Sequence, residues 1–131
     1  MIAASTKFTN NAKRVVAAKD KGAYNTFSHA AGSLRKDAAA SILKRANARK
    51  ASPVGTPPFT HAGFAKKAMW FDATKDGAVV GFRKSIFGML GAIHEHGLTE
   101  EGRDYPPRPT MAPALERNIA RFHREWRHSI S

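Results

Sequence analysis

The chain has 131 residues, of which 42% are hydrophobic and 24% are charged, and it contains no cysteine. This length suits one domain with a modest core, and the apolar stretches are too short to cross a bilayer. Without cysteine, a disulfide framework and a thiolate metal site are excluded, as suits a protein made in a reducing cytoplasm. Residues 1–7 lack the charged-then-apolar order of a secretory signal, so we expect no export by that route.

The net charge of +12 is concentrated in the N-terminal part of the chain. Residues 1–50 carry eleven Lys or Arg against two Asp, a net of +9, whereas residues 51–131 carry a net of +3. Such a field attracts any polyanion, whether DNA, an acidic membrane or an acidic protein ring. Charge alone therefore leaves the class of partner open.

Two helices are predicted in this basic region. The first covers residues 7–21, begins after Thr9 or Asn10, and is placed to end at Gly22. Ser28 is placed to cap the second helix, which runs to about Arg49 and has an apolar stripe of period four. The stripe consists of Leu34, Ala38, Ile42 and Ala46, widened by Ala39 and Leu43.

Six basic side chains near or on this second helix lie mostly off the apolar stripe. They are the candidate surface for a partner or for DNA: Arg35, Lys36, Lys44, Arg45, Arg49 and Lys50. A charge run of this kind is more often a solvated helix face that binds nothing.

Residues 51–63 contain three prolines and two glycines, a composition that ends a helix and favours an extended loop. A second Pro-rich stretch covers residues 103–109. Both are candidate interface loops, because proline lowers the ordering entropy lost on binding, although simple connectors have the same composition. The candidate interface residues in these loops are Pro53, Pro57, Pro58, Phe59, Tyr105 and Arg108, with Tyr and Arg singled out because they dominate interface hot spots.

The rest of the chain predicts a hairpin followed by two helices. The apolar runs 68–73 and 78–82 flank an Asp-Gly turn, which is a strong hairpin signal. Ser85 is placed to cap a three-turn helix that Gly97 ends in the left-handed conformation. Residues 98–110 are polar and Pro-rich and should form a loop.

That loop should contain at most one short edge strand, near Arg108–Met111. Pro113 is placed as the first residue of a final helix. This helix has the cleanest amphipathic pattern in the chain, and we expect its stripe to pack on the hairpin. The stripe consists of Leu115, Ile119, Phe122, Trp126 and Ile130.

These elements predict a small single α+β domain over residues 1–131, with an antiparallel sheet built on a β-hairpin and packed by helices. It comprises a basic helical region (1–50), a Pro/Gly-rich loop (51–63), and a part (64–131) with the hairpin, a short helix, a loop and the amphipathic C-terminal helix.

The sequence offers no constellation of catalytic groups. His94 and His96 are two residues apart, so on a helix they point about 200° from each other, unlike the paired ligands of a zinc protease. No nucleophile elbow or phosphate-binding loop is present in the chain. We therefore expect no catalytic residue, no metal, no cofactor and no enzymatic activity.

Nucleic-acid binding without sequence preference, through the basic N-terminal helices, is the alternative function. A single-strand binder would interleave aromatic platforms with its basic residues. The larger aromatic residues of this chain lie instead on predicted core faces: Trp70, Phe71, Phe82, Phe122 and Trp126. No zinc finger, basic zipper or helix-turn-helix pattern stands out either.

An ordered series of short motifs runs through residues 52–125. A Pro/Gly-rich segment (52–64) leads through Lys66-Lys67-Ala68 to a strand with Val-Gly, at 78–81; a helix ending in His-Glu-His-Gly follows at 94–97. Arg-Pro-Thr-Met at 108–111 then leads into Pro-Ala-Leu-Glu at 113–116. In this order the motifs resemble the head-tail joining family of tailed bacteriophages, the minor neck and tail-completion proteins. His96 and Thr110 stand where that family more usually has aromatic or apolar residues.

The resemblance implies a structural virion protein, made in the host bacterial cytoplasm, that forms a ring in the neck or tail, either a hexamer or a dodecamer. Its partners would be copies of itself, the connector or stopper, and the tail terminator or tail tube, with genomic DNA in the channel as a possible contact and no membrane. The basic residues 1–50 are the part that the resemblance covers least.

Overall fold

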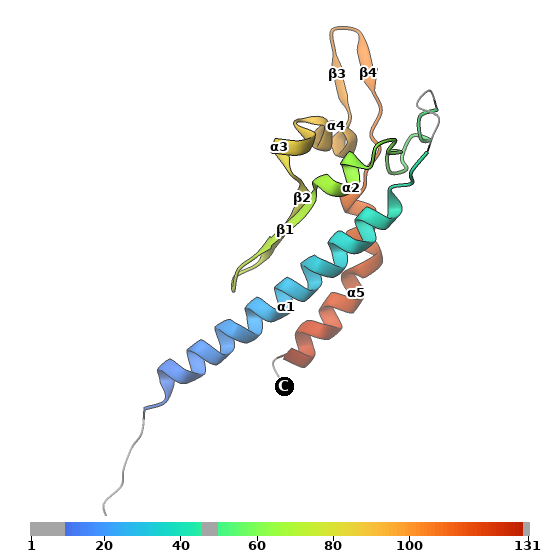
Figure 1. Ribbon diagram of the computed structural model, residues 1–131. Coiled ribbons are helices and arrows are strands. Elements are labelled where there is room, and N and C mark those ends of the chain that lie inside the picture. The colour runs from blue at the N-terminus through green and yellow to red at the C-terminus, as the bar shows by residue number, and fades with distance from the viewer. Residues whose placement is uncertain (1–9, 46–49, 130–131) are drawn as a thin grey trace, which may run out of the picture.

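The computed structural model describes residues 10–45 and 50–129 and shows one small α+β domain (Figure 1). The long helix α1 (Ala12–Ser41) is central, with the hairpin of β1 (Met69–Ala73) and β2 (Ala78–Phe82) on one side and α5 (Met111–Ser129) on the other. The predicted fold class is confirmed. The remaining elements are α2 (Phe64–Ala68), α3 (Lys84–Phe87), α4 (Leu90–His96), β3 (Leu98–Glu100) and β4 (Arg103–Tyr105).

The N-terminal region forms one helix where two were predicted. Gly22 lies inside α1, and Ser28 caps nothing because it too is in the helix interior. A glycine inside a helix costs only about 1 kcal/mol relative to alanine, and no proline follows it here. The hydroxyl of Thr26 also donates to the carbonyl of Gly22, at 3.0 Å, within the continuous turn.

Helix α1 ends at Ser41, which is earlier than the predicted end at Arg49. Ile42 adopts an extended conformation and is fully buried, so it anchors the chain as it leaves the helix. The following segment pairs with the Pro-rich loop, because Thr60 N donates to the carbonyl of Leu43 and Arg45 N donates to the carbonyl of Thr60, both at 3.0 Å. Ala46 and Arg49 lie outside the described residues.

The predicted hairpin is confirmed. Its strands pair antiparallel from Met69 opposite Phe82 to Ala73 opposite Ala78, around the predicted Asp-Gly turn. One face packs on α1, but Trp70 points away from it and is 41% exposed. The prediction that Trp70 belongs to the core is therefore wrong, because alternate residues of a strand point to opposite faces.

The single helix predicted after the hairpin is divided in two. Gly88, at φ 57°, separates α3 from α4, and α3 begins after Arg83 instead of after Ser85. Gly97 ends α4 as predicted and has a positive φ of 75°, but its ψ of 173° lies outside the left-handed helical region that was expected.

Residues 98–105 form a second hairpin where a loop was predicted. Leu98 pairs with Tyr105 and Glu100 with Arg103, around the two-residue turn Glu101–Gly102. The edge strand predicted near Arg108–Met111 does not form, because those residues lead directly into α5. All six strand residues are exposed, and the hairpin projects from the domain (Figure 1).

The C-terminal helix is confirmed, but its start and its packing partner differ from the prediction. It begins at Met111, so Pro113 is its third residue, which is tolerated because first-turn N–H groups have no partner inside a helix. It packs along α1 and not on the hairpin, and Ala114 is its buried contact. Consequently Leu115, Ile119 and Trp126 remain about 40% exposed.

The core is thin. Five of the seven fully buried hydrophobic residues among the described part of the chain are alanines, and the other two are Ile42 and Met69. Small residues let α1, α2 and α5 approach closely, but each contributes little buried apolar area. Within the described ranges, no helix is both long enough and apolar enough to span a bilayer.

Candidate interaction surfaces

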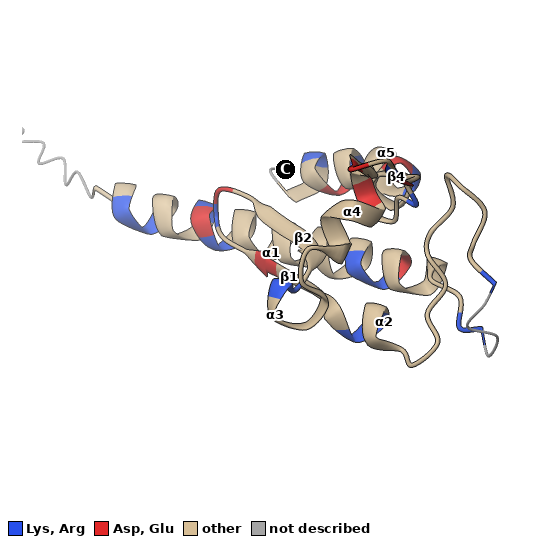
Figure 2. Cartoon of the chain, turned by 90° about the horizontal axis from the view of Figure 1, so that it is seen from above, with Lys and Arg blue, Asp and Glu red and all other residues tan. Residues whose placement is uncertain are grey.

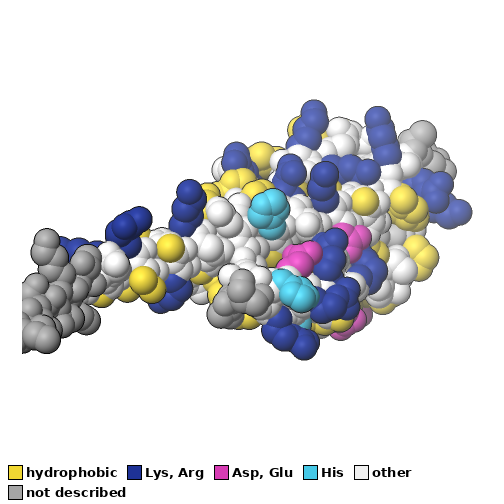
Figure 3. Space-filling model, turned by 90° about the horizontal axis from the view of Figure 1, so that it is seen from below, with side chains coloured by type: hydrophobic (Ala, Val, Ile, Leu, Met, Phe, Trp, Pro, Cys, Tyr) yellow, Lys and Arg dark blue, Asp and Glu magenta, His cyan; other side chains and the backbone are white. Residues whose placement is uncertain are grey.

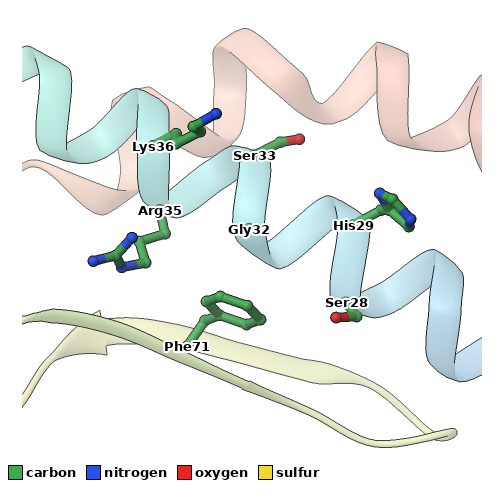
Figure 4. A pocket seen from close by; sticks show the side chains of 7 residues that line it. All are labelled: Ser28, His29, Gly32, Ser33, Arg35, Lys36 and Phe71. Atoms are coloured by element: carbon green, nitrogen blue, oxygen red, sulfur yellow. The ribbon is translucent and has the colours of Figure 1, made fainter.

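The six basic residues predicted as one surface do not lie on one helix face. Arg35 is half-buried, and its Nε donates to the carbonyl of Met69 at 2.9 Å, so it ties α1 to the hairpin. Lys36 is exposed and points to the other side of α1 (Figure 4). In the same view, Phe71 reaches from β1 toward Gly32, where an added Cβ would be in ordinary van der Waals contact with the ring at 3.8 Å.

The other predicted basic residues follow the helix or lie outside the described residues. Lys44 forms an isolated bridge with Thr60, and the guanidinium of Arg45 lies 5.2 Å from the centre of the Phe59 ring. Lys50 is exposed at the beginning of the Pro-rich loop. Arg49 is not among the described residues.

The two predicted interface loops lie side by side. Gly55 N donates to the carbonyl of Pro107 at 3.0 Å, and Arg108 Nε donates to the carbonyl of Ser52 at 3.0 Å. Arg108 therefore joins the loops to each other. The remaining loop candidates range from exposed to buried: Pro53 is exposed, Pro57 and Phe59 are half-buried, Pro58 is buried, and Tyr105 is 44% exposed.

A charged cluster that the sequence did not reveal connects α1 with α5. Asp37 accepts hydrogen bonds from Arg117 Nε at 3.1 Å and from Asn118 Nδ2 at 2.6 Å. The bond from Arg117 holds the pKa of the Asp37 carboxyl below its ordinary value, with help from Asn118 and against partial burial. Lys36 and Arg121 line the same open hollow, so this face is mainly positive.

A second feature absent from the sequence analysis is a groove of about 530 Å³ at the far end of the domain. Its walls come from α1, from the β1–β2 turn and from the end of α5. We name it the lysine groove, and it is lined by Ala18, Lys19, Gly22, Ala23, Lys75, Trp126 and Ser129. Trp126 is held beside it by the ring of Phe27, with 5.1 Å between ring centres.

The first turns of α1 form an arm that extends past the rest of the domain (Figure 1). All residues from 12 to 17 are exposed, and the arm presents Val15 and Val16 at 65% and 52% exposure. Lys13 and Arg14 lie beside them. Hydrophobic and basic side chains thus both occur on the arm, as Figure 3 shows.

The His-Glu-His motif has a structural use. Glu95 accepts hydrogen bonds from three backbone N–H groups at the start of α5, and His94 stacks on Phe87 with 5.9 Å between ring centres. Burial lowers the pKa of the His94 imidazole, and the positive charge of Arg108 lowers it further. Over residues 10–45 and 50–129, no group of three or more metal-ligating side chains converges.

No family model, curated protein or solved structure significantly matches this chain. The surfaces described above are therefore the evidence for what the protein does.

Proposed function

We propose that the protein is a structural subunit of the neck of a tailed-bacteriophage virion, forming a ring between the connector and the tail tube without chemical turnover. The observation that carries the proposal is the pair of projections from a thin core. The α1 arm exposes Val15 and Val16, and the β3–β4 hairpin stands apart from the domain.

Projections of this kind are typical of a subunit that is completed by its neighbours. An isolated two-stranded hairpin is at best marginally stable in water, and a small domain buries a smaller share of its surface than a large one. An interface would bury the apolar side chains that the single chain leaves exposed. The order of motifs between residues 52 and 125 supports the same class of protein.

The experiment has two parts. Sedimentation velocity of the purified chain over a range of concentrations should show a closed oligomer. Binding to connector rings and tail tubes encoded by the same genome should then be measured by co-sedimentation. Failure to bind either neighbouring ring would overturn the neck assignment, whatever the oligomeric state.

Nucleic-acid binding is the second candidate, and one observation favours it. Lys36, Arg117 and Arg121 line one open hollow across α1 and α5, whereas the six residues predicted from the sequence do not share one surface. Arg117, however, is already paired with Asp37.

Fluorescence anisotropy with a labelled duplex separates the two candidates. If DNA binds this hollow, Lys36→Ala with Arg121→Ala should reduce the salt slope of log K by about 2, whereas the exposed Lys84→Ala should leave it unchanged. Absence of binding at low salt would remove this candidate.

A further inference from the structure

The β3–β4 hairpin is an acidic projection on a basic protein. Residues 98–105 contain Glu100, Glu101 and Asp104 against Arg103, a net of −2, whereas the chain as a whole carries +12. Figure 2 shows red ribbon with some blue beside the β4 label, and blue bands on the exposed start of α1. The hairpin therefore presents carboxylates outward, away from the domain that carries the positive charge.

The turn of this hairpin is held in a strained conformation. Glu101 has φ 47° and Gly102 has φ 76°, which is the pattern of a two-residue turn that normally prefers Asn-Gly. A glutamate at the first position costs stability compared with asparagine. The charged tip therefore lies where local backbone energetics favour another residue.

The lysine groove is chemically complementary to this tip. Lys19 and Lys75 flank walls formed by Ala18, Ala23 and Trp126, and no carboxylate is among the residues that line it. An occupant that covers these apolar walls excludes water from the neighbouring ammonium groups, which strengthens an ion pair formed there.

Both lysines have an acidic neighbour that an incoming carboxylate can replace or share. Lys19 Nζ lies 3.7 Å and Lys75 Nζ 3.4 Å from the carboxylate of Asp20, in pairs whose lysine side chains are more than half exposed. Surface pairs of this kind contribute about 0–1 kcal/mol, so they do not block the groove.

The tip and the groove lie at opposite ends of the molecule (Figure 1). They cannot meet within one chain, but the tip of one copy can reach the groove of the next. Contacts between two different surfaces repeat head to tail, and they close into a ring when the rotation between copies closes.

We propose that the acidic tip around Glu101 binds the lysine groove of a neighbouring copy, and that this contact links subunits head to tail. The inference rests on the proposed function, since it names the contact that would build the ring. It commits to a second copy of this chain because both complementary surfaces are present on the same molecule, at opposite ends.

Reversing the tip charge tests the contact from one side. Glu101→Lys keeps an ordinary side chain at the positive φ, so the folding cost is unchanged while the tip now repels the lysines. Sedimentation velocity should show self-association weakened by about tenfold or more. Glu116→Lys makes the same change of charge on the exposed surface of α5 and should assemble like the unmodified chain.

Reversing the groove charge tests it from the other side. Lys75→Glu should weaken assembly as Glu101→Lys does, and Lys84→Glu, at an exposed position away from the groove, is its control. The double variant carrying both Glu101→Lys and Lys75→Glu should assemble again, because a positive tip then meets a negative groove. Mixing the two single variants should also restore assembly, since every contact in an alternating oligomer is complementary.

Thermal melts of each variant identify any that fail to fold, and the double variant and the mixture keep the proposal testable in that case. Assembly of Glu101→Lys equal to that of the unmodified chain would overturn the contact and leave the neck proposal standing. A chain that stays monomeric yet binds connector rings would likewise overturn the contact and leave the neck proposal standing. Charge-dependent, rescuable assembly without any binding to neck components would support the contact and overturn the neck proposal.

Discussion

The carboxylate of Glu95, near the end of α4, caps the first turn of α5 through Met111. Its Oε1 and Oε2 lie 3.0 and 3.1 Å from the backbone nitrogen of Met111, and the nitrogens of Thr110 and Ala112 each donate to it at 2.9 Å. These N–H groups have no acceptor within the helix, and the negative charge also suits the positive end of the helix dipole. One side chain from the short helix α4 thus fixes the start of α5.

Removing this cap should destabilise the domain. Glu95→Ala leaves three N–H groups without their acceptor, and we expect a loss of about 1–3 kcal/mol in the free energy of unfolding. Glu95→Gln keeps one acceptor oxygen and should lose less. Urea denaturation followed by circular dichroism measures both, with Glu116→Ala as the surface control. An unchanged midpoint for Glu95→Ala would show that the cap contributes nothing.

Removing the hydroxyl group of Thr110 should stabilise the folded domain. The side chain is fully buried, and within the described part of the chain its Oγ1 has no hydrogen-bond partner. An unsatisfied buried polar atom costs about 1–3 kcal/mol, and valine has nearly the same shape as threonine. Thr110→Val should therefore raise the melting temperature, whereas Thr99→Val, on the exposed hairpin, should not. A lower melting temperature for Thr110→Val would indicate a partner for the hydroxyl.

Arg35 and Lys36 are adjacent in sequence but should respond differently to substitution. Arg35→Ala removes the bond to the Met69 carbonyl that joins α1 to β1, and a loss of about 1–2 kcal/mol in unfolding free energy is expected. Lys36→Ala should leave stability within about 0.5 kcal/mol, because its side chain is exposed. Chemical denaturation of the two variants in parallel measures both unfolding free energies. Equal effects would contradict the conclusion that Arg35 ties α1 to the hairpin.

His94 should make stability depend on pH in a defined direction. Because its pKa is lowered in the folded state, the unfolded chain binds the proton first as the pH falls below about 6.5. Stability contributed by the neutral imidazole is thus complete above that pH and is lost as the pH falls toward the folded-state pKa.

The measurement is the melting temperature between about pH 7.5 and pH 5. His94→Gln cannot be protonated, so its curve should be flatter than that of the unmodified chain across this window. His96→Gln, at an exposed neighbouring position, is the matched control for replacing a histidine. A His94→Gln curve parallel to the original would mean that another group carries the dependence.

Two glycines in helices should respond oppositely to alanine. A Cβ at Gly22 in α1 would meet no atom within 4 Å, so Gly22→Ala should stabilise the helix by about 0.5–1 kcal/mol. A Cβ at Gly91 in α4 would lie 2.9 Å from the ring of Phe82, so Gly91→Ala should be destabilising. Thermal melts of both variants test the packing of α1 and α4, and a destabilising Gly22→Ala would contradict the open position described.

The short-range patterns of the chain predicted much of the local structure. The Asp76-Gly77 turn and its flanking apolar runs identified the first hairpin, and Gly97 identified the end of a helix. The second hairpin carried a weaker signal, since Glu101-Gly102 is a less typical turn than Asn-Gly. Its two strands were also too short and polar to be recognised beside three prolines.

Tertiary packing decided the features on which the candidate surfaces depend. Gly22 predicts a helix end, but α1 continues through it. The two predicted helices are therefore one. The predicted basic surface does not form for two other reasons: α1 ends at Ser41 instead of continuing, and Arg35 bonds to the hairpin. Neither outcome can be read from a stripe of period four.

What this sequence determined alone was the periodicity and the breaks of its elements, because these depend on residues within a few positions of each other. What only the tertiary structure decided was which faces meet: that α5 packs on α1, that Glu95 caps a helix beginning sixteen residues later, and that Lys19, Lys75 and Trp126 line one groove. Those contacts join segments far apart in the chain, and no local pattern encodes which distant surface a helix face will bury.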